Sequence, residues 1–201
     1  MCTGRTSKTP SSEGADRTDA ARATGVPAAV AFEAMEPPRP LSTTGDDESF
    51  MRLALDAAAE AAERGEVPVG AVIVSAASGH DLIDGVSVVS VASNRREESN
   101  DPTAHAEIIA LREASLKLGT WRLSDATMYV TLEPCPMCAG ALVAARLKRV
   151  VFGAPDPKAG SCGSLYNLCV DPRLNHELEV SHGVLGEHCA SLLSEFFALR
   201  R

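Results

Sequence analysis

Two cysteines, the first of them flanked by prolines, restrict the folds open to this chain of 201 residues more than any other feature. Cys135 and Cys138 lie three residues apart in the run Pro134-Cys-Pro-Met-Cys, a spacing that puts both thiols on one face of a helix. Proline is tolerated in the first helical turn, so we expect a helix from Pro136 to about Arg146. A helix start favours the thiolate, which is the form of cysteine that binds zinc.

The segment His105-Ala106-Glu107 carries a second set of reactive side chains. It lies near the start of a helix that we expect to begin after Asp101 or Thr103 and to run to about residue 118. Residues two apart point to different sides of a helix, so His105 and Glu107 cannot share a helical face. Both can border a site that faces the helix start. We therefore expect two helix starts to meet at the edge of a sheet.

One histidine and two cysteines make a set of three zinc ligands. Structural zinc sites normally have four protein ligands, whereas catalytic sites leave a position for water. Zinc lowers the pKa of bound water from about 15.7 to about 7, which gives hydroxide at neutral pH. A carboxylate that is not itself a ligand can take the proton of that water. We predict one zinc ion held by His105, Cys135 and Cys138, with Glu107 as the proton shuttle.

A closed structural zinc site is the alternative reading of the same residues. It would need a fourth ligand, for which the candidates are Cys162, Cys169, Cys189 and His176. Lone cysteines more often serve as small buried apolar side chains. A closed site would make the chain a catalytically silent, zinc-containing interaction module.

Residues 46–201 alternate between helical and strand patterns. Strands are expected at about 69–75, 86–92, 127–132, 148–152 and 177–181, and helices at about 46–64, 103–118, 136–146, 164–168 and 185–199. Strands separated by helices imply parallel crossovers, whereas the first two strands, joined only by a loop, should be antiparallel. The prediction is an α/β fold, a three-layer α/β/α sandwich with a mixed five-stranded sheet.

Residues 1–45 have a different composition. Twenty of these 45 residues are Gly, Pro, Ser or Thr, which is too polar and flexible a mixture to offset chain entropy by burial. We predict a disordered tail over 1–45 and a folded domain over 46–201. Basic and acidic side chains cancel in the tail, so the domain carries the whole net charge of −8. This charge argues against a bulk electrostatic nucleic-acid binder but does not exclude a local basic patch.

We expect neither a membrane helix nor a secretory signal in this sequence. No run of about 18 uninterrupted apolar residues predicts a membrane helix, and the first residues lack the apolar stretch of a secretory signal. We expect a cytoplasmic protein without a membrane partner. Its cysteines should be reduced, which favours metal binding or catalysis for any that cluster.

H-x-E followed by P-C-x-x-C is the signature of zinc-dependent nucleobase deaminases. Over nearly all of residues 49–201 the chain resembles the bacterial tRNA-specific adenosine deaminase family. The matching segments are Asn94-Arg95, Asp101–Ile108, Tyr129–Cys135, Met137–Ala141, Val150–Ala154, Gly163–Leu165, Asn175-His176 and Phe196-Phe197. The resemblance implies a cytidine deaminase-like fold, a zinc deaminase domain with one zinc per subunit, and a homodimer. The implied substrate is the wobble adenosine of a tRNA anticodon stem-loop, which becomes inosine.

The same resemblance implies a pocket for the target nucleoside, flipped out of the loop. Asn94 would contact the nucleoside, and Ala106 would offer backbone groups to the base. Val67 and Leu132 would form apolar walls, although both residue types equally suit plain core positions. Zinc-bound hydroxide would attack C6 of adenine while Glu107 moves the proton to N1.

Further residues would contact the rest of the anticodon loop. The resemblance assigns this role to Asp156, Lys158 and Phe197, while an apolar stripe on the last helix would also account for Phe197. Pro155 departs from the family pattern, in which a basic residue is common, and the connection over residues 76–85 is longer than usual.

A deaminase of free bases or nucleosides is the alternative function. The run Pro134-Cys-Pro-Met-Cys-Ala-Gly also resembles guanine deaminases, and the acidic net charge mildly favours a small substrate. The later matching segments favour the tRNA enzyme.

Overall fold

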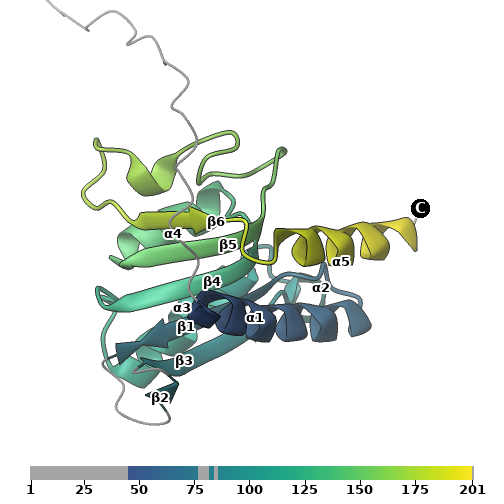
Figure 1. The fold of residues 1–201 in the computed structure, drawn as a ribbon, viewed down its shortest axis with the longest axis horizontal. Coiled ribbons are helices and arrows are strands. Elements are labelled where there is room, and N and C mark those ends of the chain that lie inside the picture. Colours follow the sequence, from purple (N-terminus) through teal and green to yellow (C-terminus); the bar gives the residue numbers. More distant parts are fainter. Residues whose placement is uncertain (1–44, 77–81, 84–85, 201) are drawn as a thin grey trace, which may run out of the picture. The chain divides into compact units, whose positions relative to one another are not determined.

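The computed structural model of the chain describes residues 45–76, 82–83 and 86–200. The tail predicted over residues 1–45 lies outside the described residues except at its last position. Most of the long connection between the first two strands lies outside them too. The described part begins with α1 (Gly45–Glu63) and ends with α5 (Gly186–Ala198) (Figure 1).

A mixed sheet forms the centre of the domain. Its strands are β1 (Gly70–Ser75), β2 (Leu82–Ile83), β3 (Val86–Ser93), β4 (Ala126–Leu132), β5 (Arg149–Ala154) and β6 (Glu179–His182). They lie in the order β2-β3-β1-β4-β5-β6. β1 runs antiparallel to β3 and β4, while β4, β5 and β6 are parallel. The five predicted strands and their mixed arrangement are confirmed, and the described residues add the two-residue edge strand β2.

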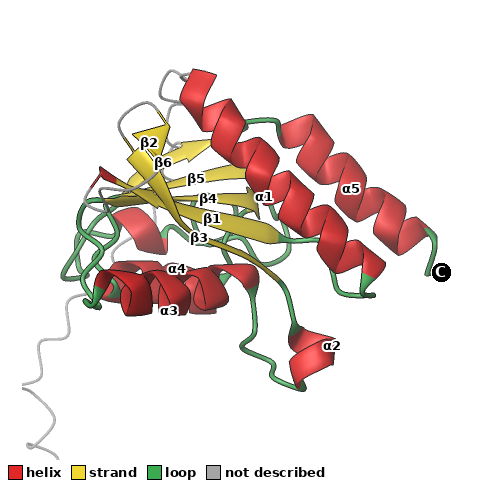
Figure 2. Ribbon diagram, turned by 90° about the horizontal axis from the view of Figure 1, so that it is seen from below, coloured by secondary structure: helices red, strands yellow, loops and turns green. Residues whose placement is uncertain are grey.

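Helices cover both faces of this sheet, as a three-layer fold requires (Figure 2). The helices besides α1 and α5 are α2 (Arg96–Ser99), α3 (Ala106–Leu118) and α4 (Pro136–Ala144). α1 and α5 lie on one face, and α3 and α4 lie on the other. The predicted short helix at 164–168 is instead a 3₁₀ turn at Leu168–Val170, and α2 was not predicted.

The alternation of side chains along the strands produces two cores. Ile73, Met128 and Val150 point into the core under α3 and α4. Their neighbours Val72 and Val151 point into the core under α1 and α5. Because β1, β4 and β5 are covered on both faces, their sequences are mostly apolar, without a regular alternation of polar and apolar residues.

A glycine lets α1 pack closely on β1. A Cβ atom at Gly70 would overlap the carbonyl oxygen of Ala54 and lie 2.8 Å from the amide nitrogen of Ala58. Only a residue without a side chain fits there. The small residues on this face of α1 bring the helix backbone down to the strand.

A buried ion pair ties α1 to the sheet. Asp47 accepts two hydrogen bonds of 2.9 Å from the guanidinium of Arg149 and one of 2.7 Å from the hydroxyl of Tyr129. Arg149 also donates to Ser181 on β6. This network joins α1 to β4, β5 and β6, and it satisfies the buried carboxylate.

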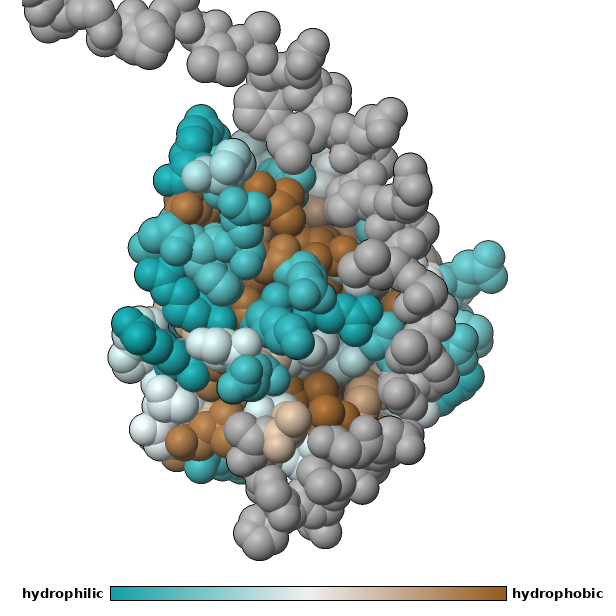
Figure 3. Space-filling view, turned by 60° about the vertical axis from the view of Figure 1, so that its left-hand side comes forward, coloured by the Kyte–Doolittle hydropathy of each residue, from teal (hydrophilic) through white to brown (hydrophobic). Residues whose placement is uncertain are grey.

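The surface of the domain carries both polar and apolar side chains. Figure 3 shows one face on which hydrophilic residues are interrupted by patches of apolar residues. Large apolar side chains that are exposed include Leu116, Trp121, Met137, Leu165, Tyr166 and Phe197. None of the helices in the described part combines the length and apolarity that crossing a bilayer requires.

Candidate metal centre and active site

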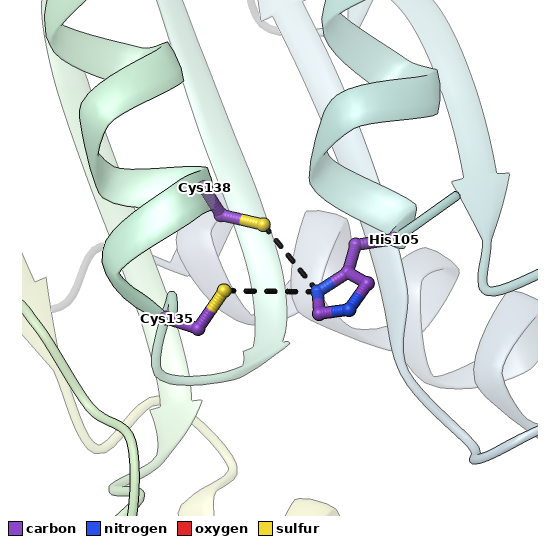
Figure 4. Close-up of side chains that lie close together, drawn as sticks. All are labelled: His105, Cys135 and Cys138. Carbon is purple, nitrogen blue, oxygen red and sulfur yellow. Dashed lines mark hydrogen bonds between the residues drawn. The ribbon is translucent and has the colours of Figure 1, made fainter. Parts of the chain in front are cut away.

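The starts of α3 and α4 bring three candidate ligands together (Figure 4). His105 and Cys135 are the residues immediately before the two helices, and each has an extended backbone. Pro136 opens α4 at the position where its missing N–H costs nothing. Cys138 follows in the first turn, on the face that points toward His105. The sequence expectation that two helix starts meet is confirmed.

Distances within this group suit a tetrahedral metal ion. Nδ1 of His105 lies 3.5 Å from Sγ of Cys138 and 3.7 Å from Sγ of Cys135. All three ligand atoms lie within 4.8 Å of one another. A tetrahedral zinc ion, with bonds of about 2.3 Å to sulfur and about 2.0–2.1 Å to nitrogen, keeps its ligand atoms about 3.5–3.8 Å apart.

The four residues considered as a fourth ligand have other surroundings. The thiols of Cys162 and Cys169 face each other at 3.4 Å, and His176 bonds the carbonyl oxygen of Leu147 at 2.7 Å. Cys189 is buried against Gly153. In the part of the chain that is described, the metal-ligand group contains three residues and none of these four. The structure therefore gives no support to the closed zinc site.

The group favours a negative charge at Cys135. The pKa of Cys135 is lowered to about 4, mainly by a hydrogen bond from Cys138 and to a smaller extent by one with His105, although partial burial opposes this shift. The hydrogen bond with Cys135 and then burial raise the pKa of Cys138. The hydrogen bond with Cys135 raises the pKa of His105. A thiolate beside an imidazole is the electrostatic arrangement that a cation can stabilise further.

Glu107 lies beside this group in the first turn of α3. Its side chain is 4% exposed, and burial raises the pKa of its carboxyl group. Oε2 of Glu107 is one of two buried side-chain oxygen or nitrogen atoms in the described residues that lack a hydrogen-bond partner. Each such atom in a folded protein calls for a reason, because an unmade buried hydrogen bond is costly. A substrate or water molecule in the site would provide the missing partner.

Asn94 is hydrogen-bonded to two other predicted substrate residues, Ala106 and Val67. Its Oδ1 accepts a 2.9 Å hydrogen bond from the backbone N–H of Ala106, and its Nδ2 donates to the carbonyl oxygen of Val67 at 3.1 Å. Asn94 therefore holds the start of α3 against the segment before β1. An amide has two lone pairs and two N–H donors, so one of each is left for a ligand. The backbone N–H of Ala106, in contrast, is already used.

The other predicted substrate residues occupy three separate places. Leu132 ends β4 and packs, half-buried, against both cores. Asp156 and the exposed Lys158 follow β5, where the backbone N–H of Lys158 donates to Asp156 at 2.9 Å. Phe197 is half-exposed on α5, across the sheet from α3 and α4, and its ring meets Phe196 edge-on. The roles of these residues stay predictions.

Sequence reasoning missed one buried acid near the site. Glu133 follows β4 directly, is 2% exposed, and accepts four hydrogen bonds from the segment after β5. An acidic residue at the end of an apolar strand, just before the ligand Cys135, was the available signal. Its partners lie 23 to 31 residues away in the sequence, so no local pattern could have named them.

Comparison with known proteins decides the family. Residues 45–201 match the MafB19-like deaminase family. A tRNA-specific adenosine deaminase of Bacillus subtilis (strain 168) is 51% identical over 151 residues, which are 75% of this chain and 88% of the relative. The chain belongs to the tRNA-specific adenosine deaminase family. The resemblance seen in the sequence is thereby confirmed.

Solved structures agree with this membership. One solved structure comes from a study of A-to-I editing by tRNA:A34 deaminases at the wobble position of transfer RNA. Its sequence is 43% identical to this chain, and the superposition has a TM-score of 0.65. The match covers 72% of this chain and 99% of the solved chain. The predicted cytidine deaminase-like fold is confirmed by this match. A structure of guanine deaminase from Nitrosomonas europaea is 24% identical to this chain, with a TM-score of 0.60. The match covers 82% of this chain and 90% of the guanine deaminase chain. At that identity the likeness shows a shared fold alone.

Proposed function

We propose that this chain hydrolyses the wobble adenosine of a tRNA anticodon loop to inosine and ammonia. The observation that carries the proposal is the three-ligand group at two helix starts, with the unpartnered oxygen of the buried Glu107 beside it. Membership of a family of tRNA adenosine deaminases supports the choice of substrate. A tRNA substrate places the reaction in the cytoplasm.

The donor set supports zinc as the cofactor, one ion per subunit. His105, Cys135 and Cys138 would hold it, because imidazole and thiolate are preferred zinc ligands and the atoms have tetrahedral spacing. When bound, zinc supplies a Lewis acid that makes a water molecule acidic near neutral pH. Three protein ligands leave a position for the reacting molecule.

Glu107 carries the protons of the reaction. Its carboxylate takes a proton from the attacking water and delivers it to N1 of adenine, while the water oxygen bonds to C6. The bond between C6 and the amino nitrogen then breaks, and the second proton of the water leaves with ammonia by way of Glu107. The unpartnered buried oxygen Oε2 of Glu107 suits this task, because no hydrogen bond at this atom must break before it accepts a proton.

The remaining residues hold the nucleoside and its loop. Asn94 binds the nucleoside through the lone pair of Oδ1 and the N–H of Nδ2 that its bonds to Ala106 and Val67 leave free. Val67 and Leu132 form apolar walls of the pocket. Asp156, Lys158 and Phe197 contact the neighbouring nucleotides, as in the family. With a net charge of −8, the chain must bind RNA through such local contacts and base stacking rather than through its overall field.

A second copy of the chain completes the enzyme as a homodimer. A groove of about 1030 Å³ lies between α3 and α4 and is lined mainly by apolar side chains, among them Ile108, Leu111 and Trp121. Leu116 borders the same groove and is 82% exposed. An apolar surface of this kind, adjoining the helices that present the ligands, suits burial against an identical surface.

Sedimentation velocity tests this dimer. We expect the wild-type chain to sediment as a dimer at micromolar concentration and Leu116→Glu to shift it to a monomer that keeps its circular dichroism spectrum. Glu187 is partly exposed on α5, on the far face of the sheet, so the charge change Glu187→Lys is the matched control and should leave the dimer intact. A monomeric wild-type chain would contradict the proposal.

The deamination reaction is tested with matched substrates. Zinc-loaded protein is offered a tRNA anticodon stem-loop with adenosine at the wobble position, the same stem-loop with guanosine there, free adenosine, cytidine and guanine. We expect ammonia and inosine only from the first. Turnover of guanine alone would instead support the free-base deaminase and contradict the tRNA assignment. Sequencing a tRNA pool before and after treatment then identifies the modified tRNA.

A further inference from the structure

Glu133 occupies a position that the proposed chemistry does not use. It follows β4, two residues before Cys135, and is almost fully buried. Oε1 accepts hydrogen bonds from the backbone N–H groups of Cys162 at 2.9 Å and Ser164 at 3.0 Å. Oε2 accepts from the backbone N–H of Asp156 at 3.0 Å and from the hydroxyl of Ser164. All four partners are uncharged donors.

These partners all belong to one segment, residues 155–164, which we name the 155–164 loop. Gly160 in this loop approaches Glu133 so closely that a Cβ atom would overlap the carboxylate and lie 2.6 Å from the carbonyl oxygen of Asp156. The backbone of Gly160 in turn donates to that carbonyl oxygen at 2.8 Å. The loop is therefore wrapped around the carboxylate.

Backbone hydrogen bonds hold the metal-ligand segment against the same loop and the strand before it. The N–H of Glu133 donates to the carbonyl oxygen of Ala154, the last residue of β5, at 2.9 Å. Within the loop, the N–H of Ser161 donates to the carbonyl oxygen of Pro134 at 2.9 Å. The 155–164 loop thus lies along the two residues that precede Cys135. It also carries Asp156 and Lys158, the two residues assigned to the nucleotides around the target.

We propose that Glu133 is a positioning residue. It holds the 155–164 loop in the position that lets Asp156 and Lys158 contact the RNA. A carboxylate accepts hydrogen bonds only, and its two oxygens offer about four acceptor sites, which equals the number of donors that the loop presents. No neutral side chain of the same size can accept from all four. The inference deepens the proposed function and rests on it.

Glu133→Gln is the decisive variant, because it keeps the size of the side chain and replaces one oxygen by an NH₂ group. The donors that met this oxygen then lose their acceptor and face another donor. We expect the KM for the anticodon stem-loop to rise at least about tenfold, the scale of a lost buried hydrogen bond to a charged group, while kcat changes less than about threefold. Zinc content should stay at that of the wild-type chain.

Amide hydrogen exchange on the zinc-loaded full chain gives a readout that does not depend on turnover. In Glu133→Gln we expect the amides of Asp156, Cys162 and Ser164 to exchange at least about tenfold faster, while the amides of β1 stay protected. A general loss of stability would instead speed exchange in the loop and in β1 together.

Two serines of the loop supply a weaker variant and a control. Ser164→Ala removes one of the four donors and should shift KM and loop exchange in the same direction by a smaller factor. It carries the test alone if Glu133→Gln fails to fold. Ser161→Ala is the control, because the Ser161 hydroxyl bonds the carbonyl oxygen of Ala159 instead of Glu133. We expect it to leave KM and the exchange of the three amides unchanged.

Several results would overturn the inference. Unchanged exchange at the three amides would show that Glu133 does not hold the loop. Faster exchange with an unchanged KM would show that the loop does not meet the RNA, and a fall in kcat alone would place Glu133 in the chemistry. A wild-type chain that leaves the stem-loop unmodified contradicts the proposed function itself, whatever the exchange data show.

Discussion

Glu107 and Glu133 are both buried glutamates, and each stands two residues from a candidate metal ligand, yet their surroundings are opposite. Glu133 accepts four hydrogen bonds, whereas Oε2 of Glu107 has no partner among the described residues. The satisfied carboxylate can organise a loop because its donors have no better partner. At Glu107 the carboxyl group interacts with the thiol of Cys138, but its Oε2 is available to a substrate. Hydrogen-bond satisfaction thus separates a structural from a chemical role where burial alone does not.

The fold retains the unsatisfied carboxyl group at a cost. A buried polar group without a partner costs about 1–3 kcal/mol, and burial raises the pKa of Glu107 for the same reason. Asn94 holds the start of α3, directly before Glu107, by its hydrogen bond from the backbone N–H of Ala106. The paired network around Asp47 and the continuous cores on both faces of the sheet offset that cost elsewhere in the domain.

The largest expected effect comes from Glu107→Gln. Removing the proton carrier should lower kcat on the stem-loop by about 10²- to 10⁴-fold, the range for loss of a general acid or base. Zinc content should not change, and the free energy of unfolding should move by less than about 1 kcal/mol, because no internal hydrogen bond of Oε2 is lost. Single-turnover kinetics and denaturant titration provide the two measurements. Activity within tenfold of wild type would assign the proton transfer to another group.

Cys135→Ser separates loss of the metal from loss of the proton carrier. A soft thiolate is replaced by a poor zinc ligand, so we expect the purified variant to bind zinc at least about tenfold more weakly and to lose turnover in proportion. Competition with a chromogenic chelator measures the affinity. Excess zinc should restore part of the activity in this variant and none in Glu107→Gln. Unchanged metal content in Cys135→Ser would remove Cys135 from the ligand set.

Asp47→Ala extends the comparison to a third buried carboxylate, one that is paired and distant from the ligands. Loss of its bonds leaves the guanidinium of Arg149, whose side chain is 18% exposed, without its carboxylate partner, so we expect a destabilisation of about 3 kcal/mol. Below the melting transition, kcat should equal that of the wild-type chain. Glu48→Ala, which breaks the exposed pair with Arg52, is the control and should change stability little. Equal stabilities for the two variants would show that burial of the pair does not matter.

The smallest effect in this series is expected for Ser164→Ala, which leaves Glu133 with three of its four donors. This variant shows whether the loss of one hydrogen-bond donor to Glu133 has a smaller effect than the change of the carboxylate itself. A KM shift smaller than that of Glu133→Gln, with kcat unchanged, would place the hydroxyl in the same loop-holding network.

The amino-acid sequence by itself determined the parts of the site that depend on residues close to one another along the chain. The spacing of Cys135 and Cys138, the prolines beside them and the helix start after His105 are local features, so they predicted the ligands and both helix starts. Apolar periodicity located five strands and the helices α1, α3, α4 and α5. α2 and β2 were missed because segments of four and two residues carry too little pattern to be recognised.

Only the tertiary structure decided which buried polar groups find partners. Glu107 and Glu133 are the same residue type in similar local settings, and their difference depends on donors that the chain brings from Asp156, Cys162 and Ser164. Likewise, Asn94 clamps Ala106 because β3 returns beside the start of α3. Hydrogen bonds over such separations form only after the sheet has placed its strands, because their geometry is set by the packing of whole elements rather than by neighbours along the chain.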